Sequence, residues 1–207
     1  MGFRWDADRS DDRNYHLCAV CFTAFEVKDL QELCPFIGPP LLDSFQEFYC
    51  LSEAQAQEAI LKYRERFATV GWLENEVYPG IPELLDRLCQ AGKTMMVATS
   101  KPEVFARKIL DHFQLAAYFS FVGGATLDGV RSTKEEVINY VLKTNEVVSL
   151  SEVIMVGDRK FDILGAKHAG VSSVGCVYGY GSREELETAG ADYVVDSIGE
   201  LQNLLLP

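Results

Sequence analysis

The sequence predicts an α/β fold in which helices cover both faces of a parallel sheet, with a small helical domain ahead of it. From about residue 94 onward, short apolar runs alternate with stretches of helical periodicity, and repeated β-α units of this kind form parallel sheets. Residues 41–70 show helical patterns only, which indicates a separate helical hairpin.

Each expected strand is short and apolar, and a helical pattern follows it. Residues 153–156 contain no polar side chain, as expected of a parallel strand that is buried on both faces. The expected strands are residues 94–98, 121–122, 153–156, 171–177 and 193–195. The expected helices are residues 41–49, 53–67, 81–90, 102–113, 134–143, 161–169, 182–189 and 198–205.

Composition limits the class of protein and its partners. The 207 residues are 48% hydrophobic and 24% charged, an ordinary balance for a globular protein, and the formal net charge is −12. An acidic surface argues against a nucleic acid or an anionic membrane as partner, although it allows a small anionic substrate in a basic pocket. Because neither a membrane-spanning stretch nor a signal-peptide pattern is present, we expect a cytoplasmic protein. We also expect either a monomer or a homodimer.

Two carboxylates follow the apolar strand at residues 153–156. Asp158 comes at the carboxyl end of this strand, where open α/β sheets bind ligands, and Asp162 lies in the first turn of the next helix. Carboxylates placed in this way can converge on one hard cation, and Mg²⁺ prefers oxygen ligands. The same spacing allows a structural alternative, in which Asp158 caps the helix and the helix dipole favours Asp162.

Hydroxyl and ammonium groups stand at two further junctions. Thr99 and Ser100 end an apolar strand just before a helix opens at Pro102, where hydroxyls and free backbone N–H groups suit a phosphate. Both residue types are also common helix caps. Lys134 opens a helix after the polar loop of residues 123–133 and could neutralise phosphate charge, the alternative being a solvated surface lysine.

Together and in this order, these residues resemble the motifs of the haloacid dehalogenase (HAD) superfamily. The resemblance covers roughly residues 29–205 and is closest to the phosphoglycolate phosphatase and 5′-nucleotidase-like branch, which has a helical cap after the first strand. The segments that carry it are Phe36–Leu41, Val77–Ile81, Val97–Pro102, Val122–Gly124, Val156–Arg159 with Asp162, Gly165–Ala166, Tyr178–Ser182 and Ala189–Tyr193. The implied fold is a Rossmann-like parallel sheet with helices on both faces and a small helical cap.

The resemblance implies a Mg²⁺-dependent phosphomonoester hydrolase. An aspartate at the end of the first strand would form an aspartyl-phosphate, and a second aspartate two residues later would serve as acid and then base. Thr99 and Ser100 would hold phosphate oxygens, Lys134 would balance charge, and Asp158 with Asp162 would hold Mg²⁺.

The implied partner is a small phosphorylated metabolite, with phosphoglycolate and nucleoside 5′-monophosphates as candidates. In this family the cap usually sets specificity. Arg64 and Arg66 of the expected cap are therefore candidate substrate contacts, the alternative being that they lie on an ordinary solvated helix face.

The first family motif, an apolar strand followed by Asp-x-Asp-Gly-Thr-Leu-x-Asp, is not intact in this chain. Asp6 and Asp8 have the right mutual spacing for the nucleophile and the acid-base residue. However, no apolar strand precedes them, and Arg9 stands where a glycine should allow the tight turn. The alternative is an acidic, solvated terminus in which the Asp-x-Asp spacing is coincidental.

A shifted reading frame accounts for this departure. Permitted codons for Met1–Ser10, read from the second base, spell Trp-Asp-Phe-Asp-Gly-Thr-Leu-Thr-Asp, which is the family's first motif. We hypothesise that residues 1 to about 25 are a frame-shifted translation. The chain is then an aberrant N-terminus (residues 1–25), a helical cap (residues 26–76) and a HAD-like α/β core (residues 77–207).

Loss of a central strand leaves apolar surface and backbone groups of its neighbours uncovered. We therefore expect a marginally stable chain with little or no phosphatase activity. The alternative function is a HAD-like protein that binds phosphate or a partner without turnover.

The coding DNA tests the frame hypothesis. We expect the second frame to encode Trp-Asp-Phe-Asp-Gly-Thr, because Met1 and Trp5 each have a single codon and the other codons allow few shifted outcomes. Sequencing across the start of the gene checks this, and any other sequence in that frame ends the hypothesis.

Overall fold

The computed structural model describes residues 3–4 and 35–206, so Asp6, Asp8 and most of the hypothesised frame-shifted segment lie outside the described residues. The chain divides into two compact units, one formed by Met1–Arg4 and Val77–Pro207 and the other by Trp5–Glu76. The predicted division between residues 1–25 and a cap over residues 26–76 stays a prediction. No helix of the described part is both long enough and apolar enough to cross a membrane.

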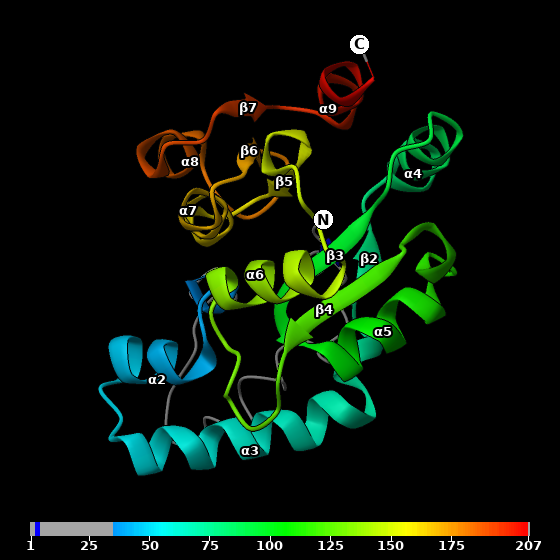
Figure 1. The fold of residues 1–207 in the computed structure, drawn as a ribbon. Coiled ribbons are helices and arrows are strands. Elements are labelled where there is room, and N and C mark those ends of the chain that lie inside the picture. Colours follow the sequence, from blue (N-terminus) through cyan, green and yellow to red (C-terminus); the bar gives the residue numbers. More distant parts are fainter. Residues whose placement is uncertain (1–2, 5–34, 207) are drawn as a thin grey trace. The chain divides into compact units, whose positions relative to one another are not determined.

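The described part of the second unit is a hairpin of two helices, α2 (Leu41–Tyr49) and α3 (Glu53–Thr69), followed by the short 3-10 helix η2 (Gly71–Leu73) (Figure 1). Ser52 begins α3 by accepting a hydrogen bond from the backbone N–H three residues later, within a capping box. Phe45 of α2 and Ala56 of α3 are buried in one apolar cluster. The two helices therefore form the hairpin that the sequence predicts.

The α/β unit alternates strands and helices in the predicted order, which confirms the α/β fold (Figure 1). Its strands are β3 (Met96–Pro102), β4 (Phe121–Ala125), β5 (Ile154–Gly157), β6 (Ser172–Cys176) and β7 (Tyr193–Val195). Its helices are α4 (Ile81–Gln90), α5 (Glu103–His112), α6 (Lys134–Thr144), α7 (Lys160–Ala169), α8 (Arg183–Ala189) and α9 (Ile198–Leu205). The two-residue strands β1 (Phe3–Arg4) and β2 (Glu76–Val77) pair with each other.

Strand β3 runs further than the sequence predicts. The expected strand is residues 94–98, whereas β3 covers Met96–Pro102. Its register with β4 shifts between Thr99 and Pro102, and Pro102 still pairs with Ala125. The irregularity lets the ladder continue past residues that resemble a helix start, so α5 begins at Glu103.

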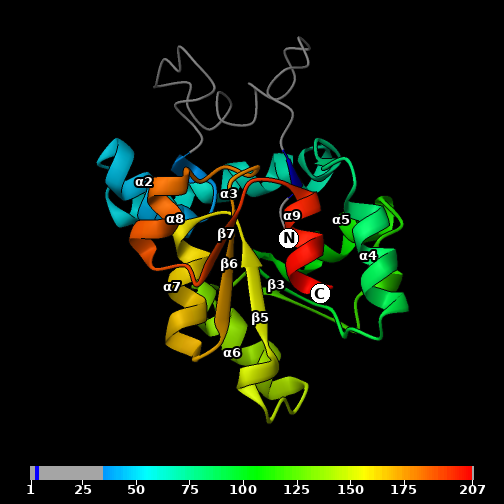
Figure 2. The ribbon, with the colours of Figure 1, turned by 90° about the horizontal axis from the view of Figure 1, so that it is seen from above.

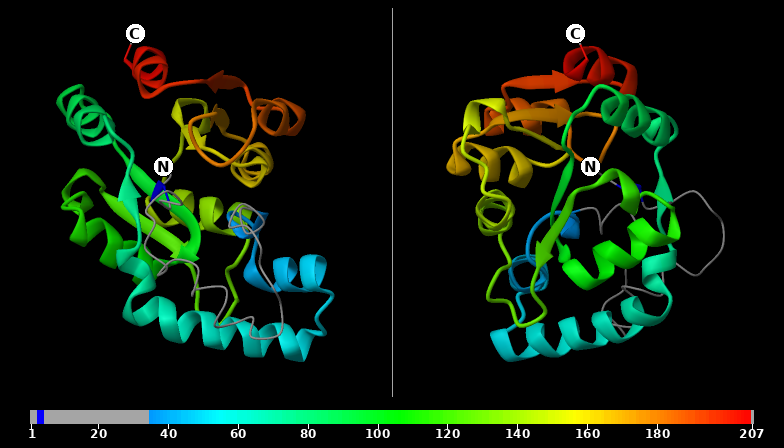
Figure 3. Two further views of the ribbon diagram at one scale, coloured as in Figure 1. Left: turned by 180° about the vertical axis from the view of Figure 1, so that it is seen from behind. Right: turned by 45° about the vertical axis from the view of Figure 1, so that its right-hand side comes forward.

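The strands form separate parallel ladders where the sequence predicts one sheet. β3 pairs with β4, while β5 pairs with β6, and β6 pairs with β7. Figure 2 shows β5, β6 and β7 side by side, and Figure 3 gives two further views of both ladders. Within the described residues no strand lies between β3 and β5.

Helices nevertheless cover both faces of β5. Ile154 and Val156 pack against a cluster that includes residues of α4 and α9. Val153 and Met155 pack against a second cluster, formed with residues of α6 and α7. Successive side chains thus alternate between two apolar layers, as the two-residue period of a strand requires.

Strands β3 and β5 are less buried than β4 and β6, the strands that pair with them. Every residue of β3 is half-buried, and so are Ile154, Met155 and Val156, whereas four of the five residues in β4 and in β6 are fully buried. The prediction that residues 153–156 form a strand packed on both faces is confirmed, although these residues are half-buried. In the described part of the chain, β6 is the strand that pairs with β5.

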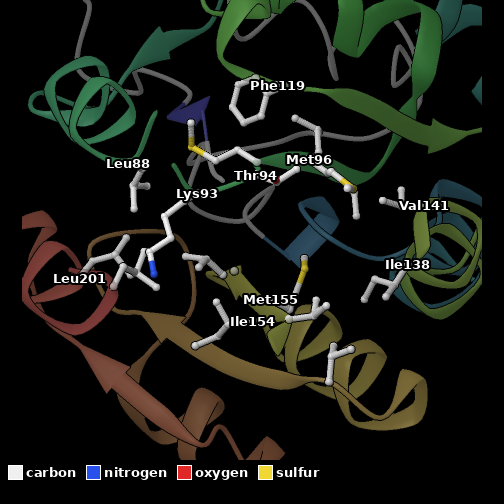
Figure 4. A pocket seen from close by; sticks show the side chains of 18 of the residues that line it. Leu88, Lys93, Thr94, Met96, Phe119, Ile138, Val141, Ile154, Met155 and Leu201 are labelled. Carbon is white, nitrogen blue, oxygen red and sulfur yellow. The ribbon is translucent and has the colours of Figure 1, made fainter. Parts of the chain in front are cut away.

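A cavity of about 770 Å³ lies beside these two strands (Figure 4). Its lining includes the consecutive residues Met95–Ala98 and Val153–Asp158, together with side chains of α4, α6 and α9. The cavity therefore occupies the place where a strand between β3 and β5 would run.

Filling this cavity should stabilise the chain. We expect Ala98→Ile to raise the free energy of unfolding by about 1 kcal/mol, because Ala98 lines the cavity and added methyl groups gain apolar contacts there. The control is Ala106→Ile on α5, where the side chain is already buried in a packed cluster and overpacking should cost about 1–3 kcal/mol. Urea unfolding measures both changes. Equal losses of the free energy of unfolding in the two variants would contradict the presence of a cavity beside Ala98.

Candidate active site

The ammonium group of Lys134 joins β3 to the start of α7, the helix that follows β5. Lys134 is the first residue of α6, and its Nζ donates to the backbone oxygen of Ala98 at 3.1 Å. The same Nζ lies 2.9 Å from Oδ1 of Asp162 on α7, and the two side chains are 12% and 8% exposed. Lys134 is thus a buried, paired lysine and not a solvated one.

Local structure explains how Lys134 reaches this position. Thr133 caps α6 through a capping box with Glu136, which fixes where the helix starts. Gly165 on α7 leaves room for the lysine stem, since a Cβ built there would lie 2.8 Å from Cγ of Lys134. The sequence shows both features, but not the contact that they allow.

Both carboxylate oxygens of Asp162 are engaged by the protein. Oδ1 faces Lys134, while Oδ2 accepts from the backbone N–H groups of Asp158 at 3.2 Å and Arg159 at 3.1 Å. Burial favours the protonated form of Asp162, but the charge and hydrogen bond of Lys134 outweigh it, so the pKa is lowered. Gly157 makes this fit possible, because a Cβ there would lie 2.2 Å from the Cβ of Asp162.

Asp158 has a different environment. Its Oδ2 accepts from the backbone N–H of Tyr180 at 2.9 Å, and no donor among the described residues is found for Oδ1. Burial, followed by the charge of Asp162, raises the pKa of Asp158. A nearby cation stabilises the charged form of a buried carboxylate with a raised pKa. Asp158 is therefore chemically suited to bind Mg²⁺.

The loop before α8 holds Asp158 from the other side. The N–H of Gly181 donates to the backbone oxygen of Asp158 at 2.8 Å. A Cβ on Gly179 would lie 2.2 Å from the Cβ of Asp158, and one on Gly181 would lie 2.2 Å from its backbone oxygen. Only glycines therefore permit this approach, and the Gly-x-Gly spacing at residues 179–181 was the signal in the sequence.

Glu185 completes the support of the Asp158 loop, a role that no sequence pattern indicates. Its Oε1 accepts from Nε of Arg159 at 2.9 Å and from the backbone N–H of Lys160 at 2.8 Å. Glu185 lies on α8, whose first turn is capped by Ser182. A side chain 26 residues away in sequence thereby fixes the start of α7.

Thr99 and Ser100 lie in the middle of β3, next to Ala98 and at the register shift. Oγ1 of Thr99 accepts from the backbone N–H of Lys101 at 3.1 Å, so its own proton is left to donate. Lys101 is a second basic residue near this site that the sequence did not suggest, and burial, which disfavours its charged form, lowers its pKa to about 8. The structure thus brings Lys134, Asp158 and Asp162 together, with Thr99 one residue beyond the Lys134 contact.

The two arginines predicted for the cap lie on α3 in the other unit. Arg66 forms a two-point ion pair with Glu74, with distances of 2.8 and 2.7 Å, and both side chains are 15% exposed. This pair ties the end of α3 to the segment that follows it. Arg64 is half-buried on the same helix, and the role of both residues in substrate binding stays a prediction.

The described residues contain no cluster of three or more His, Cys, Asp or Glu side chains that could hold a metal ion. Mg²⁺ does not require one, because it commonly binds through one or two carboxylates and keeps several waters or phosphate oxygens. Asp158 fits that pattern through Oδ1. Asp162 fits it less well, since Lys134 and two N–H groups already engage its oxygens.

Known proteins resemble this chain over most of its length. A curated 5′-nucleotidase of Pseudomonas aeruginosa is 45% identical over 187 residues, covering 90% of this chain and 84% of that protein. A phosphoglycolate phosphatase of Vibrio parahaemolyticus is 35% identical over 165 residues, covering 80% and 72%. The tyrosine-protein kinase PtkA of Mycobacterium tuberculosis is 36% identical over 172 residues, but this chain spans only 58% of its length.

Solved structures and a family model agree with these relatives. A structure titled as a predicted phosphatase from Clostridium acetobutylicum superposes with a TM-score of 0.88 at 43% identity, covering 95% of this chain and 92% of the other. Residues 11–176 match the model of the haloacid dehalogenase-like hydrolases. The resemblance predicted from the motifs is confirmed, and the chain belongs to the haloacid dehalogenase-like hydrolase family.

Proposed function

We propose that the α/β unit binds a small phosphomonoester together with Mg²⁺ between Thr99 of β3 and the Asp158 loop that follows β5, and that its reaction is hydrolysis through an aspartyl-phosphate. One observation carries this proposal. The buried ammonium of Lys134 contacts both Ala98, next to Thr99, and Asp162, next to the Asp158 loop. A cation held between a hydroxyl-bearing strand end and a carboxylate loop suits phosphoryl transfer.

Each described side chain has a role in this proposal. Thr99 and Ser100 donate hydrogen bonds to phosphate oxygens, and Lys134 offsets part of the phosphate charge. Asp158 holds Mg²⁺ through Oδ1, and Asp162 orients Lys134 and the loop. Bound Mg²⁺ would stabilise the negative charge on the phosphoryl oxygens.

Names of the relatives support the substrate class. Because curated relatives are a 5′-nucleotidase and a phosphoglycolate phosphatase, a small phosphorylated metabolite is the proposed substrate. The net charge of −12 favours such a partner over nucleic acid or an anionic membrane. A cytoplasmic location and a monomeric or homodimeric state are proposed with it.

A second candidate is a family member that binds phosphate without turnover. The observation that favours it is the separation of the two ladders, since no described strand runs between β3 and β5 to deliver a nucleophile beside Lys134. Asp6 and Asp8, the residues at the family's nucleophile and acid-base spacing, lie outside the described residues. The two candidates differ in hydrolysis and not in phosphate binding.

Ligand-induced stabilisation combined with a turnover assay separates the candidates. We expect phosphate with Mg²⁺ to stabilise the chain by about 2.7 kcal/mol at one hundred times the dissociation constant. Lys134→Met should abolish this effect, whereas Lys143→Met at the exposed end of α6 should preserve it. Thermal unfolding with and without both ligands measures the shift.

Turnover is expected to be slow for the chain as printed and to rise when the first 25 codons are read in the second frame. Release of phosphate from nucleoside 5′-monophosphates and phosphoglycolate measures it. Rapid Mg²⁺-dependent turnover by the printed chain would exclude the second candidate. Absence of any stabilisation by phosphate and Mg²⁺ would count against the site itself.

Asp158→Asn and Asp162→Asn should change stability in opposite directions at pH 7 without Mg²⁺. Asp158→Asn removes a buried charge and keeps an oxygen for the N–H of Tyr180, so the free energy of unfolding should rise by roughly 1 kcal/mol. Asp162→Asn leaves the buried ammonium of Lys134 without its counter-charge and should cost about 3–5 kcal/mol.

The pH dependence of the two variants follows from the directions of the pKa shifts. The pKa of Asp162 is lowered, so its stabilisation is present above the unfolded pKa and is lost as pH falls through the folded pKa. The pKa of Asp158 is raised, so its destabilisation appears as pH rises through the unfolded and folded values. The advantage of Asp158→Asn should therefore vanish in acid. Urea unfolding at several pH values checks both predictions. If both variants changed the free energy of unfolding in the same direction at pH 7, the roles assigned to the two carboxylates would be refuted.

A further inference from the structure

Two carboxylates bind the three consecutive backbone N–H groups of the Asp158 loop. Oδ2 of Asp162 accepts from the N–H groups of Asp158 and Arg159. Oε1 of Glu185 accepts from the N–H of Lys160 at 2.8 Å. Because N–H groups at the start of a helix have no acceptor within that helix, these carboxylates satisfy donors that the backbone cannot, and negative charge is favourable there.

The two carboxylates come from different elements. Asp162 lies on α7 itself, in the first turn after the loop, and its other oxygen is engaged by Lys134. Glu185 belongs to α8, which lies beside α7, and it reaches the loop across 25 residues of sequence (Figure 1). The loop is therefore tied to its own helix through Asp162 and to a second helix through Glu185.

The side chain of Arg159 adds a second contact to the same oxygen of Glu185. Its Nε donates to Oε1 at 2.9 Å, and the side chains of Arg159 and Glu185 are 11% and 23% exposed. Water screens a pair at this depth less than it screens a pair on the open surface. Two neighbouring residues of the loop thus share one acceptor on α8, which limits how the loop can move relative to that helix.

Glu185 is itself held by the start of α8. Oγ of Ser182 caps this helix by accepting from the N–H of Glu185 at 3.1 Å. The next residue, Leu186, is fully buried, and a Cβ built on Gly175 of β6 would lie 3.0 Å from the Cβ of Leu186. The carboxylate therefore projects from a helix turn that is both capped and closely packed.

The segment that carries Glu185 also binds Asp158 directly. The N–H groups of Tyr180 and Gly181 donate to Oδ2 and to the backbone oxygen of Asp158, at 2.9 and 2.8 Å. We call Tyr180, Gly181 and Glu185 the α8 clamp. The clamp engages one carboxylate oxygen of Asp158, and Oδ1 is the oxygen that it leaves for a cation.

We propose that Glu185 is a positioning residue for Mg²⁺, which acts through Arg159 and Lys160 to keep the Asp158 loop in the arrangement that presents Oδ1. The inference deepens the proposed function and rests on it, because it concerns the same Mg²⁺ site. Without Glu185 the N–H of Lys160 and the guanidinium of Arg159 lose this acceptor, so the loop can leave the arrangement that α8 imposes. Partners that orient a metal ligand in this way typically contribute about 10–100-fold to metal affinity.

Mg²⁺ titration of the full chain tests this role. Thermal unfolding in saturating inorganic phosphate, with Mg²⁺ as the titrant, gives the Mg²⁺ concentration for half of the maximal stabilisation. We expect Glu185→Ala to raise this concentration by about 10–100-fold. The control is Glu187→Ala on the same helix, which removes an exposed ion pair with Arg183 and should leave the concentration unchanged.

Glu185→Gln separates the position of the oxygen from its charge. Glutamine keeps an oxygen that can accept from Lys160 and Arg159, but it removes the negative charge. A positioning role requires this variant to lie closer to the wild type than to Glu185→Ala. Equal weakness of the two variants would mean that Glu185 acts only as a charge that attracts the cation, which would overturn the proposal. The glutamine variant also keeps the test open if Glu185→Ala does not fold.

Hydrogen exchange without ligands measures the α8 clamp itself. The amide of Lys160 should exchange faster in Glu185→Ala than in the wild type, because its acceptor is removed, whereas the amides of α6 should be unchanged. Equal exchange of the Lys160 amide in the two proteins would show that Glu185 does not hold the loop, and the proposal would fail.

The titration also separates this proposal from the proposed function. If phosphate with Mg²⁺ does not stabilise the wild type, the proposed function fails and the role of Glu185 fails with it. If the wild type is stabilised but Glu185→Ala is only less stable, with the same half-saturating Mg²⁺ concentration, Glu185 is merely structural and the positioning role alone is refuted. A raised concentration in Glu185→Ala, together with an unchanged one in Glu187→Ala, supports both.

Discussion

The buried ion pair of Lys134 with Asp162 is the interaction on which the candidate site depends. Lys134 also donates to Ala98, so one ammonium group links β3 to the helix that follows β5, although β3 and β5 do not pair with each other in the described residues. Because breaking such a pair leaves a buried charge, the arrangement is strongly held. Gly157 and Gly165 are required for the same reason, since side chains at these positions would collide with Asp162 and Lys134.

Local sequence signals predicted most of the fold. The bounds of α2 and α4 agree with the prediction residue for residue, because amphipathic spacing, caps and turn residues are local features. The half-burial of β5 was not predictable, since it depends on which strand lies beside it. The sequence spacing predicted that Asp158 and Asp162 lie together. Only the contacts in the structure show that Asp162 is engaged by the protein, whereas Asp158 has one oxygen available for a cation. The contact between Glu185 and Arg159 likewise joins residues far apart in the sequence, so spacing did not predict it.

Two independent observations, one from the sequence and one from the described residues, concern the family's first strand. In the sequence, the first family motif is broken at its apolar strand and its glycine, and the family match begins at residue 11, after Asp6 and Asp8. In the structure, the strands that would flank such a strand are half-buried and border a cavity. Neither observation uses the other. The remaining packing is kept because helices on both faces hold β3 and β5 without requiring them to touch.

The cavity beside β3 and β5 is adjacent to the candidate phosphate site, since Asp158 and Ala98 line the cavity and Ala98 also accepts a hydrogen bond from Lys134. A change in the packing of this cavity that alters the affinity for phosphate must, by linkage, be favoured or opposed by bound phosphate by the same factor. A packing change that leaves Lys134 and Asp158 in place would instead change only stability.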